Sequence, residues 1–343
     1  MKILIIGGTK FLGRHLLTAA QNRGHEATLF NRGRHSQESF ENVEQIYGDR
    51  NQDLDKLSGR VWDAVIDTCG YLPQTVMASA EALKNSVGQY VFISSISAYA
   101  DFSVADYDET APTAKLTDVQ RKQADTVDLK GEITGITLGE IYGGLKAACE
   151  TEVEKAFPNS SVIVRSGLIV GALDPTDRFT YWAMRVSEGG EILAPGAPNR
   201  FIQLIDARDL SEWIIEMIEN RETGIYNATG KSFELTMEKM LAEIEAVSEA
   251  DAFFTWVNED FLKRENIQEW SEMPVYLAES EKEMHGFLSA NVDKAVAKNL
   301  RFRLLSNTIN ETIRWRKTKS DPMKAGISRE RESELLVKWH GEN

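Results

Sequence analysis

The chain has 343 residues, enough for one large domain or two moderate ones around a sizeable hydrophobic core. Apolar residues make up 42% and charged residues 27%, the proportions of a globular protein in water. The 39 basic and 53 acidic residues give a net charge of −14, which disfavours nonspecific binding to the phosphates of nucleic acid. The two cysteines, Cys69 and Cys149, make no disulfide framework. We therefore expect a cytoplasmic protein, without a signal peptide or a membrane-spanning segment.

Predicted strands and helices alternate from the first residue onward. Residues 2–6 are an apolar, β-branched run, typical of a strand buried on both faces, and residues 14–23 have helical spacing. Further strands are predicted at residues 27–30, 61–67, 90–94 and 162–164, and further helices at residues 76–83 and 142–157. This order predicts an α/β fold, a Rossmann-type doubly wound parallel sheet with helices on both faces.

The pattern loosens after residue 171, where prolines and paired glycines indicate loops. Residues 204–220 return to regular structure with helical spacing, and residues 236–300 are predicted to be helical and acidic in places. Residues 327–340 are predicted to form a charged helix near the C terminus.

A glycine turn follows the first predicted strand. Backbone N–H groups in such a turn, and the positive end of the next helix, favour binding of a pyrophosphate. Gly7 permits the turn, Gly8 a close approach, and Gly13 the packing of helix on strand, although Lys10 stands where the usual triplet has its middle glycine. We predict dinucleotide contacts from Gly7, Gly8, Thr9, Phe11, Leu12 and Gly13; an ordinary strand–turn–helix is the alternative.

The end of the second strand selects between NAD and NADP. An acidic residue there favours NAD, but this chain has Asn31 followed by Arg32 and Arg34. Because arginine pairs well with phosphate, we predict NADP as the cofactor, with NAD as the alternative. Asp49, after the third strand that such a fold is expected to have, is placed to accept from the adenine amino group or to form a turn. Thr68 and Gly70 lie in the turn after the strand predicted at residues 61–67, where we expect further cofactor contacts.

A tyrosine and a lysine four residues apart, Tyr142 and Lys146, begin the last of these helices. Tyrosine has a reference pKa of about 10, too high for a good base at neutral pH. A lysine on the same helical face favours the phenolate, and its ammonium can also hold the nicotinamide ribose. Ser95 ends a buried strand at the sheet edge where ligands bind, and it is our candidate for polarising the substrate oxygen. Ser94 and Ser97 are alternatives, and any of the three can cap a turn.

Together these segments resemble the extended and atypical branch of the short-chain dehydrogenases/reductases, the NAD-dependent epimerase/dehydratase family. The resemblance rests on the glycine turn, on residues 94–99 and 142–146, and on residues 165–171, 206–210 and 226–230. Residues 174–179 are similar to a bacterial subgroup described as isoflavone-reductase-like, and a chloroplast RNA-binding offshoot shares the glycine turn. The resemblance implies a catalytic triad of Ser95, Tyr142 and Lys146 and a smaller C-terminal substrate domain. We expect the dinucleotide-binding domain at residues 1–170 and 203–230, and the substrate domain at residues 171–202 and 231–343.

The expected function is NAD(P)-dependent hydride transfer between nicotinamide and a small-molecule carbonyl or alcohol, with Tyr142 as acid and base. One alternative is a nucleotide-sugar or sugar epimerase/dehydratase that holds its cofactor tightly. Another is a cofactor-binding or RNA-binding protein without catalysis. The resemblance departs from the family in its longer interval between Ser95 and Tyr142, whose insert at residues 106–140 is expected to reshape the substrate cleft. We expect a small-molecule substrate, no metal, no nucleic acid, no membrane, and a monomer or homodimer.

Overall fold

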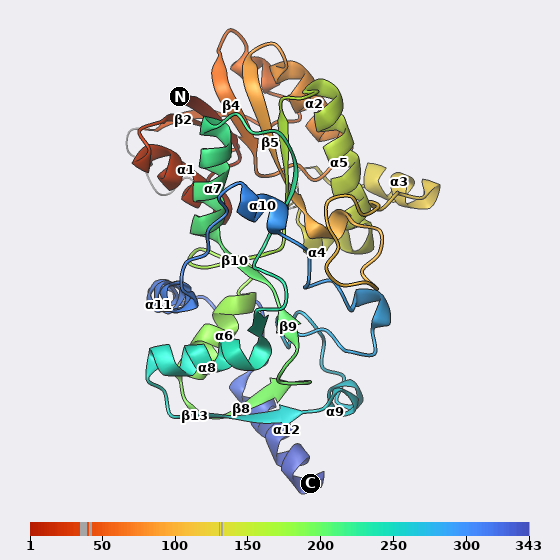
Figure 1. The fold of residues 1–343 in the computed structure, drawn as a ribbon, viewed down its shortest axis with the longest axis vertical. Coiled ribbons are helices and arrows are strands. Elements are labelled where there is room, and N and C mark those ends of the chain that lie inside the picture. Colours follow the sequence, from red (N-terminus) through yellow and green to blue (C-terminus); the bar gives the residue numbers. More distant parts are fainter. Residues whose placement is uncertain (35–39, 41–42, 130, 132, 343) are drawn as a thin grey trace.

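The computed structural model describes residues 1–34, 40, 43–129, 131 and 133–342. Two parts are stacked along the long axis of the molecule (Figure 1). The N terminus lies in the upper part, which contains the large sheet, and the C-terminal helix α12 (Arg329–Glu342) projects from the lower part.

The upper part is built on a parallel sheet of seven strands in the order β11-β6-β5-β4-β1-β2-β3. The strands are β1 (Lys2–Ile6), β2 (Glu26–Asn31), β3 (Glu44–Tyr47), β4 (Trp62–Asp67), β5 (Val87–Ser95), β6 (Ser161–Ser166) and β11 (Gly224–Ala228). The chain order reverses between β1 and β4, and in open α/β sheets ligands bind outside the carboxyl ends of the strands at such a point. The predicted Rossmann-type fold is confirmed.

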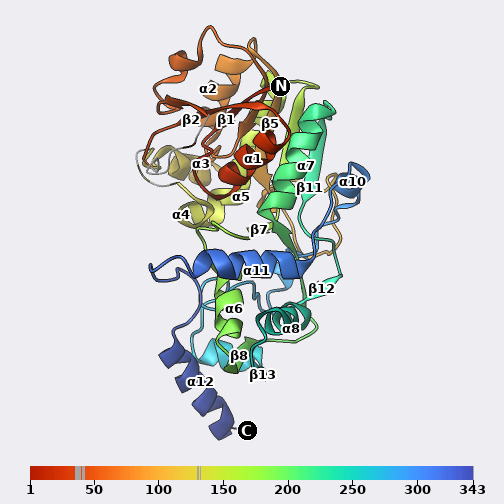
Figure 2. The same ribbon diagram turned by 90° about the vertical axis from the view of Figure 1, so that its left-hand side faces the viewer.

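Helices cover both faces of this sheet. Ile3 and Ile5 face a core with α1 (Phe11–Asn22) and α7 (Ala207–Glu219), which lie side by side in Figure 2. Leu4 and Ile6 face the other core, with α2 (Pro73–Leu83) and α5 (Tyr142–Ala156). Both faces of β1 are therefore buried, which explains its uninterrupted apolar sequence.

The segment between β5 and α5, called the insert from here on, contains four short helices among its described residues. They are η2 (Ile96–Ala98), α3 (Asp118–Asp125), α4 (Gly135–Leu138) and η3 (Gly139–Ile141). A capping box begins α3, in which the Thr117 side chain accepts from the Gln120 backbone N–H and the Gln120 side chain accepts from the Thr117 N–H. Local capping thus gives the insert structure of its own.

The lower part has a separate core around the buried side chains of Phe179, Trp182, Met240 and Ile309. Its helices are α6 (Arg178–Ser187), α8 (Met237–Ser248), α9 (Glu259–Arg264) and α11 (Leu305–Arg316), besides α12. Its strands pair in twos: β8 (Gly190–Pro195) with β13 (Ala252–Val257), and β9 (Phe201–Ile202) with β12 (Leu235–Thr236). Between the two parts, β7 (Leu168–Val170) pairs with β10 (Leu204–Asp206). The remaining short elements are η1 (Leu54–Leu57), η4 (Lys282–Met284) and α10 (Asp293–Ala297).

The prediction of a helical stretch over residues 236–300 is wrong in part. Helix α8 is there, but strand β13 follows it, and residues 265–292 contain only the short η4. Long-range hydrogen bonds hold this irregular segment: the Trp182 indole donates to the Pro274 carbonyl, and the Gln203 side chain bonds both backbone groups of Ala290. Because these hydrogen-bond partners lie far away in the chain, the local sequence does not reveal that the segment is irregular. The helix predicted at residues 327–340 is present as α12.

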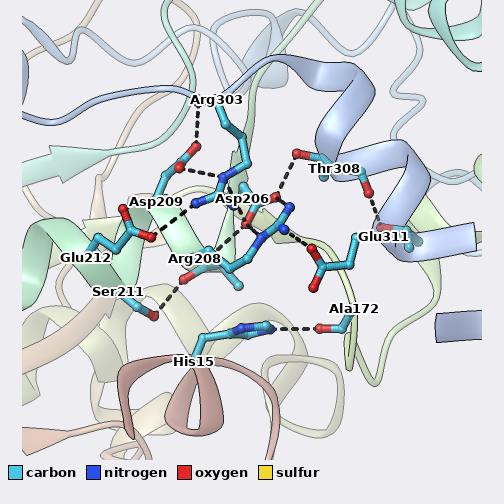
Figure 3. A network of polar contacts seen from close by, with 12 residues as sticks. His15, Ala172, Asp206, Arg208, Asp209, Ser211, Glu212, Arg303, Thr308 and Glu311 are labelled. Atoms are coloured by element: carbon cyan, nitrogen blue, oxygen red, sulfur yellow. Dashed lines mark hydrogen bonds and ion pairs between the residues drawn. The ribbon is translucent and has the colours of Figure 1, made fainter. Parts of the chain in front are cut away.

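A polar cluster joins α11 to β10 and α7 (Figure 3). Asp206, which caps α7, accepts from the Arg208 side chain and from the Thr308 hydroxyl at 2.7 Å. Asp209 accepts from Arg303, just before α11, at 2.6 Å. This cluster ties a helix of the lower part to the helical layer of the upper sheet.

A buried carboxyl, that of Asp174, precedes α6. It accepts the Thr176 N–H and hydroxyl, each at 2.8 Å, and is 1% exposed. Burial raises the pKa of Asp174 to about 6, against the opposing effect of the Thr176 hydrogen bonds. The native state thus binds a proton that the unfolded chain has already released between its ordinary pKa of 3.8 and about 6. The contribution of Asp174 to the free energy of unfolding is therefore fully present below pH 3.8 and is lost as the pH rises to about 6.

We therefore expect the unfolding free energy of the native protein to fall, relative to Asp174→Asn, by about 2–2.5 kcal/mol between pH 4 and pH 7. Denaturant titrations of both proteins across this range measure the difference. Parallel pH profiles would contradict the assignment.

Candidate cofactor site and active site

The conformation and close packing of the glycine turn exclude side chains at its glycine positions. Gly7 and Gly8 have φ angles of +96° and +81°, in the region that favours glycine. A β-carbon on Gly13 would lie 2.4 Å from the Gly8 Cα, so the start of α1 packs directly against the turn. No side chain caps α1 at Lys10, and the first N–H groups of a helix lack partners within it. These features are suited to binding a pyrophosphate by the backbone N–H groups around Thr9, Phe11 and Leu12.

At the end of β2, Asn31 shapes the next turn. Its side chain is buried, and its Oδ1 accepts the Gly33 N–H at 2.8 Å. Arg32 and Arg34 are exposed beside it. Asp49 Oδ1 accepts both the backbone and the side-chain N–H of Asn51, each at 2.9 Å, so this residue forms the turn that was its alternative role.

The turn after β4 lies against the glycine turn. The Thr68 hydroxyl donates to the Ile6 carbonyl at 2.8 Å, and a β-carbon on Gly7 would lie 2.5 Å from that hydroxyl oxygen. The Gly70 carbonyl accepts from Lys146 at 2.8 Å. The structure therefore brings Thr68 and Gly70 between the predicted pyrophosphate site and the candidate catalytic lysine.

Lys146 is a buried cation with a defined position. It is 3% exposed, and its Nζ donates to the carbonyls of Gly70 and Ile93 at 2.8 and 2.7 Å. The aromatic rings of Tyr71 and Phe92 lie 4.9 and 4.8 Å from the same nitrogen. An ammonium has three donors, so one further hydrogen bond is within its capacity.

Tyr142 is the first residue of α5 and is half-buried. A β-carbon on Gly135 would lie 3.4 Å from its ring, so α4 of the insert packs against it. The ring also joins an apolar cluster with Leu138 and Ile141 of the insert and with Leu72. The insert thus covers the candidate catalytic tyrosine.

Ser95 ends β5, and its Oγ accepts the Ser97 N–H at 3.1 Å. The next short helix, η2, presses on the first turn of α5, because a β-carbon on Gly143 would lie 2.0 Å from the Ser97 carbonyl oxygen. This close packing requires glycine after Tyr142, and it brings the segments that carry Ser95 and Tyr142 together at the carboxyl end of the sheet.

A buried ion pair beneath these residues was absent from the sequence predictions. Glu150 on α5 pairs with Arg165 on β6 at 2.8 Å, with side chains 4% and 3% exposed. Glu150 also accepts from the Ser94 hydroxyl. The available signals were a charge at the end of the apolar run 162–164, and a glutamate one helical turn after Lys146.

The fold is that of a Rossmann-type α/β protein, and this arrangement is a candidate dinucleotide site. The model of the NAD-dependent epimerase/dehydratase family matches residues 3–229, and the chain belongs to this family of nicotinamide enzymes, which are of the extended short-chain dehydrogenase/reductase type.

Solved structures share this fold across nearly the whole chain. A UDP-glucuronic acid 4-epimerase from Bacillus cereus, in complex with NAD, is 18% identical with a TM-score of 0.63, covering 93% of this chain and 99% of that one. A UDP-N-acetylglucosamine 4-epimerase from Bacillus cereus is 15% identical with a TM-score of 0.65, covering 94% and 99%.

A curated relative has a different description. The chloroplast stem-loop binding protein of 41 kDa b from Arabidopsis thaliana is 26% identical over 251 residues, which are 68% of this chain. The match spans 59% of the length of that relative. Separately, no helix in the described part of the chain has the length and apolarity needed to cross a lipid bilayer.

Proposed function

We propose that the protein transfers a hydride between a nicotinamide cofactor and a carbon that bears a hydroxyl or carbonyl oxygen, with Tyr142 as the acid and base. The observation that carries this proposal is the position of Lys146, a buried ammonium one helical turn after Tyr142 with one donor to spare. When bound, the cofactor accepts or supplies the hydride at C4 of nicotinamide. Lys146 would hold its ribose, and the glycine turn its pyrophosphate.

The protein's residues move and hold the proton. In the oxidative direction, the Tyr142 oxygen takes the proton of the substrate hydroxyl as the carbon loses its hydride; in the reductive direction it returns the proton. Ser95 would donate to the same substrate oxygen. The insert against the Tyr142 ring limits the access of water on that side. The position of Ser95 at the end of β5 and of Tyr142 at the start of α5 supports these roles.

The epimerase form of this reaction is the one that we favour. The chain belongs to an epimerase/dehydratase family, and epimerases are among its structural neighbours. In this form, the carbon oxidised in the first step is reduced again from its other face, and the cofactor is retained unchanged. The expected simple oxidoreductase stops after one hydride transfer: it releases the ketone or alcohol, and its cofactor is left reduced or oxidised.

Product analysis separates the two forms. The purified protein is assayed for bound cofactor and is then incubated with UDP-sugars, and with small carbonyl compounds plus NADPH. Interconversion of sugars without net consumption of cofactor supports the epimerase. Stoichiometric oxidation of NADPH supports the reductase instead, and failure to bind either NADPH or NADH would overturn the proposal.

We further propose a preference for NADP over NAD, because Arg32 and Arg34 are exposed at the end of β2 and no carboxylate ends that strand. We expect NADPH to bind more tightly than NADH. Arg32→Ala should narrow the difference between their binding free energies by about 1.5–3 kcal/mol, because a charge-assisted hydrogen bond to the 2′-phosphate is lost. Fluorescence titration at fixed salt measures both affinities. Arg121→Ala, an exposed arginine on α3, is the control. Equal affinities in the native protein would refute this preference.

Binding to RNA is a second candidate function, favoured by the description of the Arabidopsis relative. We propose that this chain does not share it. Basic residues are frequent between residues 301 and 319. Among them, Arg303 is paired with the Asp209 carboxylate, and Arg316 is buried and paired with the Asp321 carboxylate. These cations are already neutralised, in a chain of net charge −14.

We therefore expect no complex with a stem-loop RNA at about 150 mM salt, because nonspecific binding requires free cations that displace several counterions. Fluorescence anisotropy with a labelled stem-loop tests this. Micromolar or tighter binding that weakens as the salt concentration rises would instead support the RNA-binding function.

A further inference from the structure

A second buried ion pair lies between the predicted adenine side of the cofactor site and the turn after β4. Arg50 follows Asp49, and Asp67 precedes Thr68. The two side chains form a bidentate pair, Nη1 to Oδ1 at 2.8 Å and Nη2 to Oδ2 at 2.7 Å. Arg50 is 8% exposed and Asp67 is fully buried. None of the proposed proton or hydride steps uses this pair.

Other groups complete the bonding around it. Asp67 also accepts the Tyr90 hydroxyl at 2.9 Å and the Cys69 backbone N–H at 3.1 Å. Arg50 also donates to the Ser79 hydroxyl at 2.9 Å. Burial alone would raise the pKa of Asp67, but the charge and hydrogen bonds of Arg50 lower it below the usual value, so the carboxylate stays ionised.

The pair therefore fixes the backbone of the turn that follows β4. Asp67 holds the Cys69 N–H, which lies between two residues of the cofactor site. On one side, Thr68 packs on the glycine turn at Gly7. On the other side, the Gly70 carbonyl holds the ammonium of Lys146. A shift of this turn would displace both contacts at once.

Burying two charged side chains costs desolvation free energy. Apolar side chains of similar volume often replace a buried ion pair without loss of stability, whereas a bidentate pair also fixes orientation. We propose that Arg50 is a positioning residue: through Asp67 it orients residues 68–70, so that the glycine turn and Lys146 are held ready for the cofactor. This inference rests on the proposed binding of a nicotinamide dinucleotide. Arg50 itself is not assigned a contact with the cofactor.

The test compares NADPH affinity with stability. Arg50→Met and Asp67→Asn each remove one member of the pair. The matched control is Arg185→Met, which breaks the pair between Arg185 of α6 and Glu332 of α12, whose side chains are 3% and 2% exposed. Each protein is titrated with NADPH by fluorescence, and its folded fraction is checked by circular dichroism and denaturant unfolding.

We expect all three variants to lose stability. Only Arg50→Met and Asp67→Asn should weaken NADPH binding, by about tenfold or more per folded molecule, and the control should stay within about twofold. Unchanged affinity in the folded Arg50 and Asp67 variants would overturn the proposal, and so would an equal loss of affinity in the control.

A milder variant covers failure to fold. Tyr90→Phe keeps both charges and removes one hydrogen bond to Asp67, so we expect about threefold weaker binding with the fold intact. Native affinity in Tyr90→Phe would count against the positioning role if the stronger variants do not fold. If the native protein binds neither NADPH nor NADH, the proposed function itself fails; if it binds and the variants bind equally well, only the role of Arg50 fails.

Discussion

Tyr142→Phe is expected to bind the cofactor normally and to lose most of its turnover. The substitution removes the phenolic oxygen that exchanges the substrate proton, but it keeps the ring that packs against Gly135 and the apolar cluster. General acid–base groups contribute about 10²–10⁴-fold to rate, so kcat on an identified substrate should fall by that factor. Steady-state kinetics and an NADPH titration on the same preparation give the two measurements.

A neighbouring tyrosine provides the control. The Tyr71 ring lies 6.4 Å from the Tyr142 ring and also faces Lys146, so Tyr71→Phe removes a nearby hydroxyl while leaving the ring beside the ammonium. It should retain near-native turnover. Lys146→Ala should reduce both binding and turnover. Near-native activity of Tyr142→Phe would show that another group exchanges the proton.

Glu150→Leu is expected to destabilise the protein by about 3–5 kcal/mol, the usual effect of leaving one charge of a buried pair without its partner. Arg165, 3% exposed in its side chain, would keep its charge beside the Tyr99 ring, and Ser94 would lose its acceptor. Denaturant unfolding monitored by circular dichroism measures the change.

Glu152→Leu, on the same helix, is the matched control. Glu152 pairs with Lys155 at the surface, where the lysine side chain is 64% exposed, and surface pairs contribute about 0–1 kcal/mol. Similar losses of stability in the two variants would mean that the burial of the Glu150 pair has no special weight.

The fold followed from local patterns because each element carries its own periodicity. The apolar run of β1, the glycines after it and the strand–helix alternation indicate a parallel sheet without knowledge of any contact. The spacing of Tyr142 and Lys146 likewise lies within one helix, and the structure shows both on α5. Their catalytic roles remain predictions.

What the sequence did not disclose depends on contacts between distant segments. Asp67 pairs with Arg50 from a different loop at the end of the sheet, and no helical or strand periodicity relates the two positions. Glu150 and Arg165 come together only when α5 packs on β6. Strand β13 was missed for a related reason: its partner is β8, about sixty residues earlier, and Phe253 at its start is exposed.

The place of β11 in the sheet has a consequence for protein engineering and for synthesis. Gly224–Ala228 pairs with β6 and forms the edge of the sheet beside it. A fragment that ended at residue 170 would leave a bare row of β6 N–H and C=O groups, and such a row invites pairing with another chain. The Tyr99 hydroxyl would also lose the Asn227 side chain to which it donates. A fragment that ended at residue 170 should therefore aggregate unless residues 203–230 are supplied. During synthesis, the same edge of β6 stays unpaired until Ala228 has left the ribosome.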